Sequence, residues 1–166
     1  MINKLHLEMI RLYGKDAKRI QHFCKVHGYA KLIAESEGVD GDTLFAIEAA
    51  ALTHDIGIHL CEEKYGNCGG KLQEKEGPAV AKKLLDELGF EPAVTERVMY
   101  LIAHHHTYEN IDGIDYQILV EADFLVNIYE DGLSSEAAES AYNNIFRTEA
   151  GKRICREMFG IKTNGK

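Results

Sequence analysis

A histidine and an aspartate stand side by side, as His54 and Asp55, at the end of an apolar, alanine-rich stretch that includes Ala49. Ionisable groups buried at the end of such a stretch are costly unless a charge or a hydrogen bond satisfies them. An adjacent imidazole and carboxylate there indicate a site for a metal ion. A second carboxylate, Asp123, lies in the most apolar part of the chain, where a cation, an arginine partner or protonation would offset its burial.

The segments that carry these groups have helical patterns. Apolar residues recur at spacings of three and four over residues 16–37, and Gly38 follows, which predicts a long helix. Pro78 and Pro92 both stand where a first helical turn would begin. The remaining helices are predicted over 43–55, 78–88, 92–105, 115–130, from Ser134 or Ser135 to 146, and over 148–159. Residues 65–71 predict a loop and 162–166 a frayed tail, and without any alternating strand pattern the predicted fold is all-α.

The length and composition favour one domain. The chain has 166 residues, of which 45% are hydrophobic, enough for one well-buried core and too short for two comfortable domains. We therefore expect a single domain over 1–166, with a motif-bearing core over about 16–131 and C-terminal helices over 134–160. The net charge of −8, from 27 acidic and 19 basic residues, argues against nucleic acid as a structural partner and disfavours it as a substrate.

The cellular setting is predicted from what the chain lacks. The N-terminus has no apolar core of signal-peptide length, and no apolar run reaches membrane-spanning length, so we expect a cytoplasmic protein without membrane association. The four cysteines form no CxxC pair and no zinc-finger spacing, and we expect free thiols at Cys24, Cys61, Cys68 and Cys155. Only the general frequency of symmetric dimers favours a homodimer.

Three segments, in order along the chain, carry a recognisable set of motifs: one runs from Arg19 through His22, one is the doublet itself, and one surrounds Asp123. Together they resemble the HD-domain superfamily of metal-dependent phosphohydrolases, and the resemblance covers about residues 19–125. It implies an HD-domain, PDEase-like helical bundle, with the doublet at the catalytic centre. The metal ligands that it implies are His22, His54, Asp55 and Asp123.

Other residues could also serve this site. His27 lies on the apolar stripe of the first predicted helix, so geometry alone leaves it open as the first ligand, although the register of the motif favours His22. Glu48 stands about two turns before Asp55 and His59 one turn after it. Either could orient a ligand or take a proton.

The implied ligand set determines the class of metal. Two imidazoles and two carboxylates suit one divalent ion of Fe, Mn, Co, Ni or Zn rather than Ca. We expect a single ion because residues 72–79 look like the place where binuclear members carry metal-binding histidines, and this segment contains none. Such an ion would lower the pKa of its water and neutralise charge on phosphorus, which is enough for phosphoester hydrolysis.

Candidate substrate contacts lie near the predicted ligands. Arg19 is one turn ahead of His22, and Lys71 and Gln73 follow the Gly-rich loop, so each could contact a phosphate. Ile58 stands where many relatives of the cyclic-dinucleotide phosphodiesterase type have lysine, which argues against that specificity.

Three consecutive histidines, residues 104–106, follow the helix predicted from Pro92. On a regular helix neighbouring side chains point about 100° apart, so all three cannot reach one ion. The family often uses a histidine near this point to grip phosphate or to hold a second metal, and His104 and His105 are the candidates. Favourable placement against a helix C-terminus explains any one of them equally well.

The expected function is hydrolysis of a small phosphate ester, most plausibly a nucleotide or nucleoside phosphate, with the substrate as the only expected partner besides a second copy of the chain. Two alternatives stay open. A di-iron oxygenase of the same fold would need extra ligands from residues 104–106 and His59, and it would contain two irons with a visible or near-ultraviolet absorption. A non-catalytic module that uses the metal as a staple or senses a ligand would bind metal without turnover.

Overall fold

The computed structural model describes residues 1–162, and within them it contains nine helices and no β-strand, which confirms the all-α prediction. The expected frayed tail falls mostly on residues 163–166, which lie outside the described residues. The helices are α1 (Ile2–Leu12), α2 (Ala17–Glu37), α3 (Gly41–Thr53), α4 (Ile58–Tyr65), α5 (Gly70–Leu88), α6 (Pro92–Ile102), α7 (Ile114–Glu130), α8 (Ser135–Asn144) and α9 (Glu149–Phe159).

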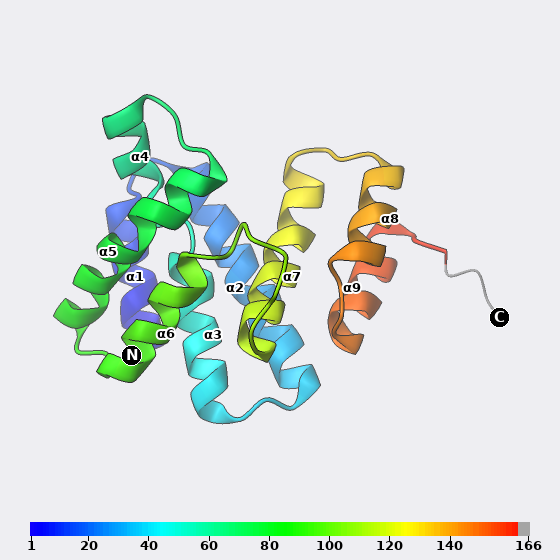
Figure 1. The fold of residues 1–166 in the computed structure, drawn as a ribbon, viewed down its shortest axis with the longest axis horizontal. Helices are drawn as coiled ribbons and strands as arrows, with labels where there is room; N and C mark the ends of the chain where they lie inside the picture. The colour runs from blue at the N-terminus through cyan, green and yellow to red at the C-terminus, as the bar shows by residue number, and fades with distance from the viewer. Residues whose placement is uncertain (163–166) are drawn as a thin grey trace.

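The core is built around α2, α3 and α7. Figure 1 shows α1 and α4–α6 on one side of this group and α8 and α9 on the other. Ala49, Ala50 and Ala51 of α3 are fully buried, and their small side chains let the neighbouring helices approach closely. α2 packs against both α3 and α7, and α5 packs against α6. α3 also packs against α7, and the C-terminal end of α3 precedes His54 and Asp55.

Two helices, the start of a third and the end of a fourth differ from the sequence prediction. α1 and α4 were not among the predicted helices, and α5 begins at Gly70 rather than at Pro78. A proline inside a helix removes one hydrogen bond and crowds the residue before it. Here that residue is Gly77, which has no Cβ to clash with the ring, so the helix continues through Pro78. α6 ends at Ile102, three residues before the predicted end, so residues 104–106 lie in a turn.

One stretch, Gly41–Tyr65, is long and apolar enough to cross a membrane by length and composition, contrary to our prediction that no run reaches that length. In the structure a turn at residues 54–57 divides it into α3 and α4. In addition, 72% of its most apolar window is buried inside the protein. Its apolar side chains therefore serve as core.

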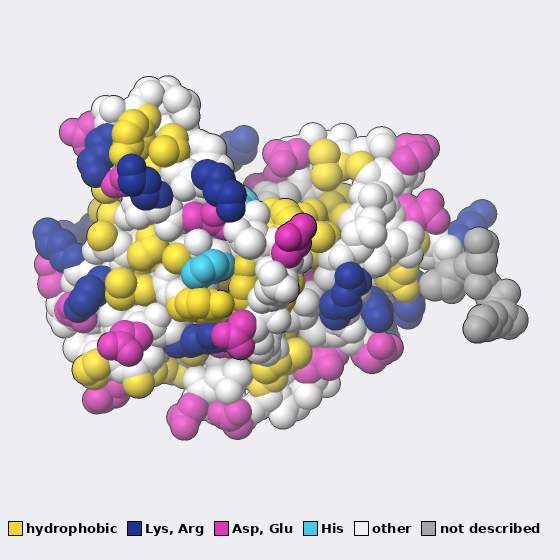
Figure 2. Space-filling model, viewed as in Figure 1, with side chains coloured by type: hydrophobic (Ala, Val, Ile, Leu, Met, Phe, Trp, Pro, Cys, Tyr) yellow, Lys and Arg dark blue, Asp and Glu magenta, His cyan; other side chains and the backbone are white. Residues whose placement is uncertain are grey.

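The surface seen in Figure 2 carries mixed charges. Basic and acidic side chains are interspersed over this face, which is hollowed between α4 and the end of α7. All four cysteines are free thiols, as predicted.

The C-terminal helices are attached to α7 through Glu121, whose side chain is completely buried. Its carboxyl oxygens accept hydrogen bonds from Gln117 Nε2 at 2.7 Å and from the backbone N–H groups of Arg147 and Thr148 at 2.6 and 2.9 Å. The hydroxyl of Thr148 donates to the same carboxyl group at 2.5 Å and accepts from the Gly151 N–H at 2.9 Å. This network satisfies free N–H groups at the start of α9 and joins that helix to α7.

Candidate metal centre

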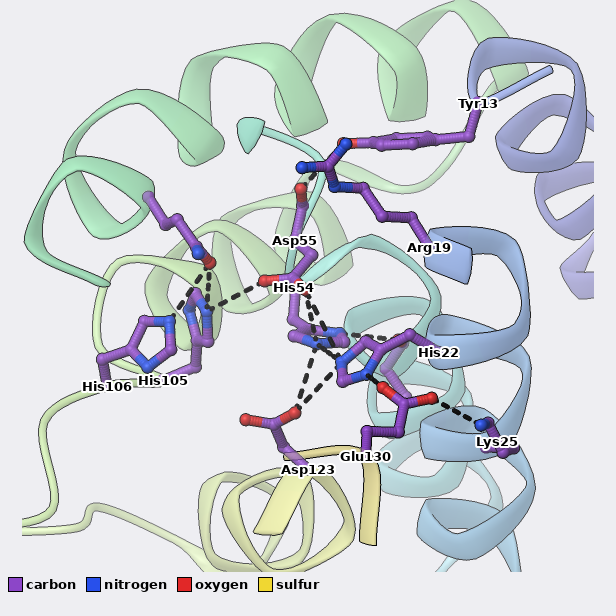
Figure 3. A network of polar contacts seen from close by, with 12 residues as sticks. Tyr13, Arg19, His22, Lys25, His54, Asp55, His105, His106, Asp123 and Glu130 are labelled. Atoms are coloured by element: carbon purple, nitrogen blue, oxygen red, sulfur yellow. Dashed lines mark hydrogen bonds and ion pairs between the residues drawn. The ribbon is translucent and has the colours of Figure 1, made fainter. Parts of the chain in front are cut away.

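Four predicted ligands from α2, α7 and the turn after α3 meet at one point (Figure 3). His22 Nε2 of α2 lies 3.2 Å from Nε2 of His54, which directly follows α3. Asp123 Oδ1 of α7 is 3.2 Å from His22 Nε2 and 3.6 Å from His54 Nε2. Asp55 Oδ2 is 3.6 Å from each of these nitrogens. The ligand atoms of His22, His54 and Asp123 all lie within 4.8 Å of one another.

In His22 and in His54, the hydrogen-bond partner of Nδ1 determines whether Nε2 presents a lone pair or a hydrogen to the cluster. His54 Nδ1 lies 2.9 Å from the Ala51 carbonyl, and His22 Nδ1 lies 2.8 Å from Glu130 Oε2. Because a carbonyl and a carboxylate can only accept, Nδ1 carries the hydrogen in both rings and Nε2 of a neutral ring presents a lone pair. Two lone pairs therefore face each other at 3.2 Å, an arrangement that needs a cation or a proton between them.

Asp123 gives an independent test of whether these residues fit a metal ion. Its Oδ1 is buried and has no hydrogen-bond partner in residues 1–162. A buried carboxylate oxygen without a donor is costly, and a cation removes that cost. Two imidazole nitrogens and carboxylate oxygens are the donors that divalent transition metals prefer. The residues present therefore fit such an ion.

The electrostatics of the metal-free cluster favour a bound proton. Burial lowers the pKa of His54, but the charges of Asp55 and Asp123 outweigh it and raise that pKa to about 9. Burial also disfavours the charged carboxylates, yet the two histidines hold the pKa of Asp123 well below its usual range. His54 and His105 likewise lower the pKa of Asp55 to about 2 against the effect of burial. A metal ion must displace this proton, so metal affinity rises with pH.

A second group of potential ligands adjoins the first through Asp55. Asp55 Oδ1 lies 3.7 Å from His105 Nε2, and Gln73 Oε1 lies 3.3 Å from His105 Nε2 and 3.1 Å from His106 Nε2. His105 Nδ1 donates to the Ile102 carbonyl at 2.7 Å, so its Nε2 also faces the cluster. Burial lowers the pKa of His106 to about 4, which keeps that ring neutral.

The structure differs from the sequence prediction in the choice among the three histidines. His104 Nδ1 donates to the Tyr100 carbonyl at 2.7 Å, and its ring lies against that of Tyr100 with centroids 4.3 Å apart. His104 is thus turned away, whereas His106, which we had not selected, joins His105 with ring centroids 4.1 Å apart. The reason is that α6 ends at Ile102, so the 100° rule for a regular helix does not apply to these residues.

Arg19 lies close to the site but is already paired. Its guanidinium binds Asp16 and Glu62, each at 2.5 Å, and Figure 3 shows it beside the Tyr13 hydroxyl, near Asp55. Tyr13, which the sequence did not reveal, donates its hydroxyl to the Asp55 backbone carbonyl at 2.8 Å. A phosphate that reaches Arg19 competes with Glu62.

Lys71 lies farther out, with 79% of its side chain exposed. Its ammonium group binds Glu74 at 2.8 Å and the Thr107 hydroxyl at 2.9 Å. Glu74 also accepts the backbone N–H of His106 at 3.1 Å, so Lys71 is linked to the second group of ligands only through this carboxylate.

Three other candidates lie outside the cluster. His27 Nε2 is 3.0 Å from Glu48 Oε1, which also accepts from Lys31 at 3.2 Å. His59 is exposed and lies 3.4 Å from Asp16. The geometry therefore places His22 rather than His27 beside His54.

Comparison with known proteins agrees with the fold and the motifs. The model of the HD domain family matches residues 19–147. The crystal structure of a predicted HD superfamily hydrolase from an uncultured Thermotogales bacterium has a TM-score of 0.65 and 26% sequence identity to this chain, covering 96% of this chain and 83% of the other. Among curated proteins, none is significantly similar in sequence. The predicted HD-type helical fold is thereby confirmed.

Proposed function

This chain belongs to the HD-domain family, and from that premise we propose that it is a metal-dependent hydrolase of small phosphate esters, with nucleotides or nucleoside phosphates as the substrate class. The observation that carries the proposal is the convergence of two imidazole lone pairs with Oδ1 of Asp123, an oxygen that has no hydrogen-bond partner among the described residues. The similar crystal structure is itself described as a predicted hydrolase, which supports the same activity. We also propose a cytoplasmic location.

His22, His54, Asp55 and Asp123 would hold one divalent ion of Fe, Mn, Co, Ni or Zn. The chemistry supplied by such an ion is the acidification of water and the neutralisation of charge on phosphoryl oxygens. Asp55 has the most exposed side chain of the four, at 22% against 1–11% for the others. It is therefore the ligand that faces incoming water and substrate.

Asp55 and the residues around it can orient water and bind the phosphate group of the substrate. Asp55 stays ionised at neutral pH because its pKa is about 2, so its Oδ1 can accept a hydrogen bond from the attacking water and orient it. Gln73 and His105 lie on the other side of Asp55. Gln73 can donate to a phosphoryl oxygen if its amide group is rotated so that the NH₂ faces the site, and His105 can donate through Nε2 when its ring is charged. Arg19 supplies positive charge to a phosphate that displaces Glu62.

The test combines elemental analysis of the purified protein with hydrolysis of a panel of nucleotides and simple phosphate esters. We expect about one metal per chain and metal-dependent release of phosphate, both lost in Asp123→Ala. His27→Ala is the control, because it removes a part-buried histidine of α2, the helix that carries His22, outside the cluster, and it should keep both properties. Metal without turnover would favour the non-catalytic module, and no metal in the wild-type protein would show that the ligand assignment is wrong.

A second candidate function is favoured by the second ligand group. Asp55, His105 and His106 could hold another ion beside the first, as a di-iron oxygenase requires. Two irons per chain with a visible or near-ultraviolet absorption, and no phosphate release from any ester, would favour this alternative over the hydrolase.

A further inference from the structure

Glu130 is the last residue of α7. It lies beside the candidate metal centre (Figure 3) but is not one of the four proposed ligands. Its Oε2 is 2.8 Å from His22 Nδ1, and its Oε1 is 2.5 Å from the Lys25 ammonium group. The side chain is only 13% exposed. Each carboxylate oxygen therefore has one partner on α2, and the two partners are three residues apart, on the same face of that helix.

Helix stability does not explain a carboxylate at this position. The C-terminus of a helix carries the negative end of its dipole, so an acidic residue there is unfavourable and a basic one favourable. The last turn of α7 contains no basic residue. The contacts of Glu130 with His22 and Lys25 must offset this local penalty, which means that its role lies in those contacts.

A comparison of His22 with His54 shows what the contact between Glu130 and His22 does. His54 Nδ1 is held by the Ala51 carbonyl three residues earlier in the same chain segment, so its ring orientation is determined locally. His22 Nδ1 has a partner from another helix, Glu130, and no backbone carbonyl of residues 1–162 holds it. The direction of His22 Nε2 therefore depends on how α7 packs against α2.

We propose that Glu130 is a positioning residue that holds His22 in the tautomer and orientation needed to bind the metal ion, with Lys25 holding the carboxylate in place. This inference rests on the proposed metal site. α7 then supplies Asp123 directly and, two turns later, the group that orients a second ligand. Carboxylates hydrogen-bonded to a ligating histidine also make the ring a stronger donor, and their loss typically weakens metal binding about 10–100-fold.

The test is titration of the metal-free protein with Co²⁺, which reports affinity and, through its visible absorption, the coordination geometry. Glu130→Ala should weaken Co²⁺ binding by about 10–100-fold and change the absorption spectrum. Glu130→Gln keeps an acceptor for His22 Nδ1 but loses the negative charge, so we expect an intermediate affinity. Lys25→Met leaves the carboxylate free to rotate and should cause a smaller loss than Glu130→Ala.

Glu48→Gln provides a matched control, because Glu48 accepts from a histidine and a lysine in the same way but outside the metal centre. It should bind Co²⁺ like the wild type. If Glu130→Ala, or Glu130→Gln where the alanine variant does not fold, binds Co²⁺ with wild-type affinity and spectrum, the positioning role is wrong. Wild-type protein that binds no Co²⁺ would instead overturn the proposed metal site itself.

Discussion

Two glycines that lie inside helices should respond in opposite ways to replacement by alanine. Gly28 is in α2 and Gly151 in the first turn of α9. A Cβ on Gly28 would meet no atom of the described residues within 4 Å beyond the neighbouring backbone of α2 itself. A Cβ on Gly151 would lie 1.9 Å from Glu121 Oε2 and 2.7 Å from the Thr148 hydroxyl, so Gly151→Ala must displace the buried carboxyl group that joins α9 to α7.

The size of the effect follows from the bonds that Glu121 would lose. Each buried donor left without its acceptor costs about 1–3 kcal/mol. The backbone N–H groups of Arg147 and Thr148 both depend on this carboxyl group, which gives a loss of roughly 2–6 kcal/mol. Alanine recovers up to about 1 kcal/mol through its higher helix propensity. The net loss is about 1–6 kcal/mol, which lowers the melting temperature by at least roughly 2–4 °C.

Thermal unfolding followed by circular dichroism measures both variants. Gly28→Ala should raise the melting temperature by roughly 1–4 °C, because it gains about 0.4–1 kcal/mol from a less flexible unfolded chain without a clash. If Gly151→Ala is as stable as the wild type while Gly28→Ala is stabilised, the Glu121 network does not hold α9 in the way we describe.

Three further predictions concern the metal centre. A divalent ion at a hundred times its dissociation constant adds about 2.7 kcal/mol, so it should raise the melting temperature by roughly 5–11 °C. Asp123→Asn should lose most of this shift in a thermal-shift assay, and an equal shift would mean that Asp123 is not a ligand. In protein freed of metal, the pKa of His54 is raised to about 9 from an ordinary 6.5, so its stabilisation is complete below pH 6.5 and lost as the pH rises through 9. Melting temperatures from pH 6 to 10 should therefore fall in the chelated wild type by roughly 7–14 °C and fall less in His54→Asn, whereas parallel curves would contradict the raised pKa. Gln73→His places a third imidazole beside His105 and His106, so elemental analysis should show an increase from about one to about two metals per chain, and an unchanged ratio would argue against a second site there.

The helices were predictable where the apolar pattern is local and strong. α2 and α7 lie within two residues of their predicted bounds, because their periodicity and their end residues agree. α1 was missed although Leu5, Met9 and Tyr13, all buried, recur at every fourth residue, a signal that could have identified it. The start of α5 was misplaced because Pro78 normally marks a first turn, whereas here the helix continues through the proline because the residue before it, Gly77, has no Cβ to clash with its ring.

For the candidate site, the sequence predicted which residues are the proposed ligands but not the residues that surround them. The motif register selected His22, which the structure places beside His54 and Asp123, because register along one helix specifies a face. Glu130 and Lys25 were missed, although Glu130 lies seven residues after Asp123 and such spacing puts both on one face of a helix. His106 could not have been chosen over His104, since that choice depends on where α6 ends.

By itself the sequence determined the helical class, the types of the proposed ligands and therefore the class of metal that they suit, because these follow from local periodicity and from the donor atoms of individual side chains. Only the tertiary structure decided which ring nitrogens face one another, which two of the three consecutive histidines join Gln73, and which glycine cannot carry a side chain. Those outcomes depend on how α2, α3, α6 and α7 pack together, and packing joins residues that no local pattern relates.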